Sequence, residues 1–107
     1  MPSGIEIDWT TAASAFGGAY FNLLRRGADG SLSLSSDHWR LTEATETTFT
    51  FSAREADAPP LEVRRAEVDR TLWERLPKQI IRSQIRFFLS TGDLWTFSGN
   101  VDESALE

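Results

Sequence analysis

The most constraining feature of the sequence is a β-hairpin signature in residues 80–99, IIRSQIRFFLSTGDLWTFSG. Two runs rich in β-branched and aromatic residues flank residues 90–92, which suit a short loop with Gly92 in the left-handed conformation. This loop sets the register of the two strands. It predicts three opposite pairs: Phe88 with Leu94, Phe87 with Trp95, and Ile85 with Phe97.

Side chains alternate between the two faces of a strand, so the register divides the hairpin into two sets. We expect the set of Ile85, Phe87, Trp95 and Phe97 to face the core. The other set contains Phe88 and Leu94, an apolar pair where a solvated sheet face would be polar. We expect this pair to be covered by a terminal helix or a neighbouring strand, or else to form a partner interface.

Length and composition limit the possible classes of protein. The chain has 107 residues and is expected to form a single domain, residues 1–107. It contains no cysteine, which excludes disulfides, thiolate nucleophiles and cysteine metal sites. Its net charge of −5 argues against direct nucleic-acid or membrane binding, because phosphate-binding surfaces need an excess of basic residues.

The N-terminal part of the chain is interpreted as a strand, a connector and a second region of strands. Residues 5–9 alternate apolar and acidic side chains and predict a strand, and the small residues 10–15 predict a connector. Residues 31–35, SLSLS, alternate strictly. We expect Leu32 and Leu34 to point into the core.

The rest of the chain continues the pattern of short strands, and residues 53–60, with a double proline, predict the longest exposed loop. Residues 100–107 look like the start of a helix, so we expect a fragment of a longer chain. About seven strands with a C-terminal helix predict a mainly β fold. The expected form is a small antiparallel pleckstrin-homology-like barrel or orthogonal sandwich. The further strands are expected within residues 20–24, 38–42, 47–52, 61–63 and 70–76.

Several runs resemble one known family. FNLL at residues 21–24, GSLSLS at residues 30–35 and HWR at residues 38–40 are similar to the opening of the N-terminal domain of the small, structure-specific-recognition subunit of the FACT histone chaperone. LWER at residues 72–75 and the strand, Gly turn and aromatic strand of residues 85–99 also resemble this family. The chain departs from the family pattern at residues 37–38 and 99–100.

The resemblance implies a non-enzymatic module that heterodimerises with a second pleckstrin-homology-like domain, in the large subunit of the chaperone. It also implies a nuclear protein that acts on nucleosomes, without a cofactor and with histones contacted through other regions. If the resemblance does not hold, the expected location is the cytoplasm.

Two alternative functions remain open from the sequence. The first is a phosphoinositide-binding pleckstrin-homology or GRAM domain, in which Arg25 and Arg26 would contact the anionic head group. The second is a small β-barrel enzyme or ligand carrier, which requires a deep pocket with converging polar groups. His38 is the sole histidine, and acid–base catalysis or metal binding would need partner residues, so no catalytic, metal or cofactor residue is assigned.

Overall fold

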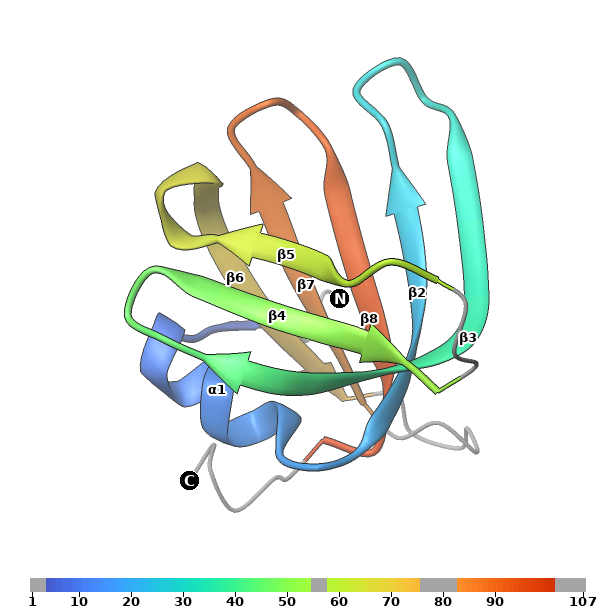
Figure 1. Ribbon diagram of the computed structural model, residues 1–107. Helices are drawn as coiled ribbons and strands as arrows, with labels where there is room; N and C mark the ends of the chain where they lie inside the picture. Colours follow the sequence, from blue (N-terminus) through green and yellow to red (C-terminus); the bar gives the residue numbers. More distant parts are fainter. Residues whose placement is uncertain (1–3, 55–57, 76–82, 102–107) are drawn as a thin grey trace.

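The computed structural model describes residues 4–54, 58–75 and 83–101. In this part of the chain, eight strands form one antiparallel sheet in the order β1-β6-β7-β8-β2-β3-β4-β5 (Figure 1). This confirms the predicted mainly β fold of antiparallel sandwich type. The expected C-terminal helix falls largely on residues outside the described ranges. The elements are β1 (Ile5–Glu6), α1 (Trp9–Phe16), β2 (Tyr20–Arg26), β3 (Leu32–Ala44), β4 (Thr48–Ala53), β5 (Leu61–Arg64), the 3-10 helix η1 (Arg65–Glu67), β6 (Val68–Arg75), β7 (Ser83–Leu89) and β8 (Leu94–Gly99).

The sheet folds over into two layers because one long strand, β3, belongs to both. The first part of β3 pairs with β2, and its last part pairs with β4. In Figure 1, β6, β7, β8 and β2 form the rear layer, whereas β4 and β5 cross in front of it. The apolar faces of the two layers therefore oppose each other and enclose the core.

A bulge in β3 allows the strand to pass from one layer to the other. Phe21 of β2 lies opposite Trp39, but Leu23 lies opposite Ser35, so the register between β2 and β3 shifts between these two pairs. Within the extra β3 residues, His38 has a φ of 58°, in the left-handed region. Extra residues of this kind bend a strand and increase its local twist.

We expect His38→Val to lower the free energy of unfolding by about 1–2 kcal/mol, because a β-branched residue is strained in the left-handed region. His38→Asn should leave stability nearly unchanged, since asparagine tolerates this conformation. The His38 side chain is exposed, so neither variant removes core packing. Urea denaturation of the three proteins measures the difference, and equal midpoints for the Val and Asn variants would contradict the assignment of strain.

The N-terminal segment differs from its prediction. Residues 10–15 form most of α1 rather than a connector, and the first strand contains only Ile5 and Glu6. The helix is capped by Asp8, whose Oδ1 accepts a hydrogen bond of 2.7 Å from the backbone N–H of Thr11. This hydrogen bond holds the pKa of Asp8 below its usual value. The helix ends at Gly17, which has a φ of 53°.

Helix α1 places aromatic side chains into the space between the layers. Phe16 is fully buried at its C-terminal end, and Trp9 is buried at its N-terminal end. The Trp9 ring stacks on Phe49 of β4 with centroids 3.7 Å apart, and Trp9 Nε1 donates a 2.8 Å hydrogen bond to the Thr45 carbonyl. Phe16 contacts five further rings, with centroids 5.0 to 6.2 Å away: Phe21, Phe49, Phe51, Phe87 and Phe97.

The β7–β8 hairpin has the predicted register. The pairs Phe88–Leu94, Phe87–Trp95 and Ile85–Phe97 all occur, and Gly92 has a φ of 94°. Ile85, Phe87 and Phe97 are fully buried, and Trp95 is half-buried against the core. No helix in the described residues is long and apolar enough to cross a membrane.

Candidate interaction surface

The most unusual surface feature is a pair of leucines on β3. Leu32 is 67% exposed and Leu34 is 70% exposed, so the prediction that they point into the core is wrong. The register explains the difference: Ser35 lies opposite Leu23, which is fully buried. The serines of residues 31–35 therefore share the inner face with Leu23, and the leucines lie on the outer face.

Further apolar side chains adjoin these leucines on the outer face. Leu24 lies opposite Leu34 and is 37% exposed. Arg26 lies between Leu32 on one side and Leu94 of β8 on the other. Leu94 lies in turn opposite Phe88 of β7. We call this set the outer apolar face: Leu24, Leu32, Leu34, Phe88 and Leu94.

The predicted Phe88–Leu94 pair lies at one end of this face, and both side chains are half-buried. The flanking strands β6 and β2 lie beside the pair in the same sheet rather than over it. Arg70 of β6 lies opposite Phe88, with its guanidinium carbon 5.5 Å from the ring centroid and its Nε 3.7 Å from a carboxylate oxygen of Glu6. Arg70 therefore covers part of Phe88 and remains exposed itself.

A surface depression of about 520 Å³ follows the same end of the face, where the β2–β3 and β7–β8 turns meet. Phe88 and Leu94 contribute apolar lining, and the charged lining residues balance, with Arg26 and Arg70 against Asp69 and Asp93. The backbone N–H of Ala28 donates a 3.1 Å hydrogen bond to Asp93 Oδ1, which joins the two turns. The depression thus brings together residues from two hypotheses. Phe88 and Leu94 were predicted as a partner interface, and Arg26 was predicted as a contact for an anionic head group.

Arg25 and Arg26 do not converge. As neighbours on a strand they project from opposite faces of β2. The guanidinium carbon of Arg25 lies 5.5 Å from the centroid of the Trp95 ring, which packs against the core, whereas Arg26 is exposed beside Leu94. A phosphate group at the outer depression would therefore meet Arg26 and not Arg25.

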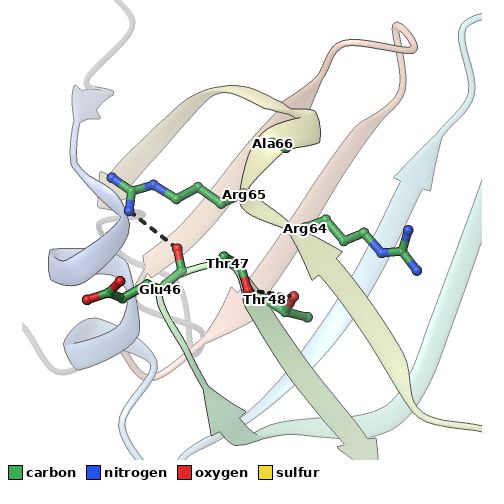
Figure 2. A pocket seen from close by; sticks show the side chains of 6 residues that line it. All are labelled: Glu46, Thr47, Thr48, Arg64, Arg65 and Ala66. Carbon is green, nitrogen blue, oxygen red and sulfur yellow. Dashed lines mark hydrogen bonds between the residues drawn. The ribbon is translucent and has the colours of Figure 1, made fainter.

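A second depression, of about 490 Å³, lies at the start of β4 beside η1 (Figure 2). Arg65 Nη1 donates a 3.3 Å hydrogen bond to the Glu46 carbonyl, and the Arg65 backbone N–H donates one of 2.8 Å to the Thr47 carbonyl. Figure 2 shows Arg64 and Arg65 pointing to opposite sides. The two guanidinium groups therefore do not form a common anion site.

The remaining ionisable residues do not assemble into a cluster with metal-binding composition. Within residues 4–54, 58–75 and 83–101, no group of three or more His, Asp or Glu side chains gathers closely enough to hold a metal ion. His38 lies exposed on the β3 bulge, away from the depressions described above. The outer apolar face is therefore the feature that most clearly calls for a functional explanation.

The sequence predicts the strand register of the outer apolar face but not which side of the sheet is buried. The turn at residues 27–30 implies the register that places Leu24 opposite Leu34. However, β2 carries Leu23 on one face and Leu24 on the other, so the pattern did not show which face is buried. The chain matches no family model, no curated protein and no solved structure.

Proposed function

We propose that this domain is a non-enzymatic protein-interaction module that docks a partner on its outer apolar face. The observation that carries the proposal is the high exposure of Leu32 and Leu34, next to Leu24 and the half-buried Phe88–Leu94 pair. Contiguous exposed apolar surface on a folded domain is typical of a site that a partner covers.

The composition of the face suits a protein partner. Apolar side chains of β2, β3, β7 and β8 make up the face, with Arg26 between Leu32 and Leu94 and Arg70 beside Phe88. Apolar side chains together with arginine are typical of protein interfaces, in which arginine is enriched and lysine is depleted. The specific form suggested by the family resemblance is heterodimerisation with a pleckstrin-homology-like domain of the large FACT subunit.

The proposal is tested by titrating the domain with that recombinant large-subunit domain in a calorimeter. We expect Leu34→Lys and Phe88→Glu each to weaken binding by about tenfold or more, since each places a charge within the apolar surface that the partner would cover. Leu34 is largely exposed, so Leu34→Lys should leave the thermal midpoint of the free domain unchanged.

Glu62→Gln is the matched control, because it adds the same positive charge increment as Leu34→Lys on the exposed surface of β5, in the other layer. It should bind as the unchanged protein does. If the unchanged domain binds but Leu34→Lys and Phe88→Glu bind equally well, the outer apolar face is not the docking surface. If the unchanged domain does not bind, this partner is wrong.

A further inference from the structure

The first part of β3 is an open edge of the sheet. Within the described residues, β2 pairs with β3 from Leu32 onward, but β4 pairs with β3 only from Trp39 onward. In Figure 1 this part of β3 forms the outer margin of the rear layer. Residues 31–35 contain neither proline nor a charged residue, the usual protections of an exposed edge.

The turn beside β3 shows which backbone groups point toward the open edge. The N–H of Gly27 donates a 2.8 Å hydrogen bond to the carbonyl of Ser31. Hydrogen-bonded and non-hydrogen-bonded pairs alternate along an antiparallel ladder, so Arg25–Ser33 is a hydrogen-bonded pair. The pairs Arg26–Leu32 and Leu24–Leu34 are then of the other type, and the N–H and C=O groups of Leu32 and Leu34 point away from β2.

The sequence of this edge is palindromic. SLSLS reads the same in both directions, with Ser33 at its centre. Two copies placed antiparallel about a two-fold axis at Ser33 would set Leu32 of each copy opposite Leu34 of the other. We infer that the partner of this edge is a second copy of the chain, which joins through β3 to form a continuous sheet across the dimer.

The pairing would give hydrogen-bond partners to the backbone N–H and C=O groups that point away from β2 at the open edge. The outward N–H and C=O of Leu32 would bond to those of Leu34 in the second copy, and the reverse. The leucine side chains of both copies would become cross-strand neighbours on one outer face. An uncharged edge does not favour a charged peptide as its partner. A second copy of the same palindromic segment matches this edge residue for residue.

This inference rests on the proposed function in one respect: both use the exposed β3 leucines. The two differ in the groups that carry binding. A partner docked on the outer apolar face needs the leucine side chains, but edge pairing also needs the backbone N–H groups of β3. The experiments below separate the two.

The first experiment uses the absence of cysteine from the chain. In the inferred dimer the two Ser33 residues form a non-hydrogen-bonded pair with Cα atoms about 4.5 Å apart, within the range of a disulfide. Two Ser31 residues would lie about 13 Å apart along the strands. Under mild oxidation, Ser33→Cys should give covalent dimer at least about tenfold faster than Ser31→Cys.

The second experiment measures dimerisation of the unchanged chain, Leu34→Pro and Leu34→Thr by analytical ultracentrifugation over a range of concentrations. Proline removes the outward N–H but no hydrogen bond to β2, as edge strands tolerate. Threonine keeps the N–H and removes only apolar surface. Leu34→Pro should raise the dimer dissociation constant by about tenfold or more, and Leu34→Thr by less.

A monomeric unchanged chain at high concentration, or equal crosslinking of the two cysteine variants, would overturn the inference and leave the heterologous interaction in place. A dimer weakened equally by Leu34→Pro and Leu34→Thr would also overturn it, because binding would then depend on side chains alone. Far-ultraviolet circular dichroism of Leu34→Pro checks that the variant keeps the β content of the unchanged chain.

Discussion

Phe16→Ala is expected to lower the free energy of unfolding by about 3–5 kcal/mol, the range for removal of a fully buried phenylalanine ring. The Phe16 side chain has no exposed surface. It contacts rings from both layers of the sheet, including Phe51 of β4 at 5.0 Å and Phe97 of β8 at 5.4 Å between centroids. The cavity would therefore open at the point where helix and both layers meet.

Most small domains are stable by only about 5–15 kcal/mol, so this loss is a large fraction of the total. Urea denaturation followed by far-ultraviolet circular dichroism measures it. Phe88→Ala is the matched control: it makes the same chemical change at a half-buried site on the outer face, and should lower stability by only about 1 kcal/mol. Equal effects of the two substitutions would show that Phe16 does not occupy the core.

Trp9→Ala is expected to have the next largest effect, about 3 kcal/mol or more. Its ring stacks on Phe49 at 3.7 Å, and its Nε1 bonds to the carbonyl of Thr45 in the β3–β4 turn. Both contacts join the N-terminal end of α1 to the front layer. Their loss should free the helix from the layer, because no helix of eight residues is stable alone in water.

Trp9→Phe separates the two contributions. Phenylalanine keeps a ring against Phe49 but cannot donate to Thr45, so this variant should lose only about 1–2 kcal/mol. The comparison is made by thermal and urea unfolding of the two variants. If Trp9→Phe were as unstable as Trp9→Ala, the hydrogen bond rather than the stacked rings would hold the helix.

The hairpin could be predicted from the sequence because its signals agree. Gly92 supplies the left-handed residue that the turn needs, and the flanking aromatic and β-branched residues favour strands. A turn of known geometry sets the register of both strands. The pairs from Ile85–Phe97 to Phe88–Leu94 then follow without knowledge of the rest of the fold.

Helix α1 could not be predicted in the same way. Its central residues, TTAASA, are small and show no strong apolar period, so its formation depends on what the two ends contact. The N-cap Asp8 and the terminating Gly17 were present as signals, but each is common outside helices. Burial of Trp9 and Phe16 decides the structure, and this is a tertiary effect.

The outer apolar face was predicted only at one end. Phe88 and Leu94 could be identified because they form an apolar pair on one face of a hairpin whose other face is clearly a core face. Leu32 and Leu34 were misplaced because strict alternation shows that two faces differ, not which of them is covered. The neighbouring strand decides the matter, through the burial of Leu23.

The continuity of β3 through both layers has a consequence for how the molecule comes apart. A single backbone segment, bent at His38, is hydrogen-bonded to β2 in one layer and to β4 in the other. The two ladders share Trp39 and Arg40 of β3, so opening of one layer disturbs the backbone that also carries the other. Amide protons of β2 and β4 should therefore exchange with solvent at similar slow rates, through one all-or-none opening of the whole domain.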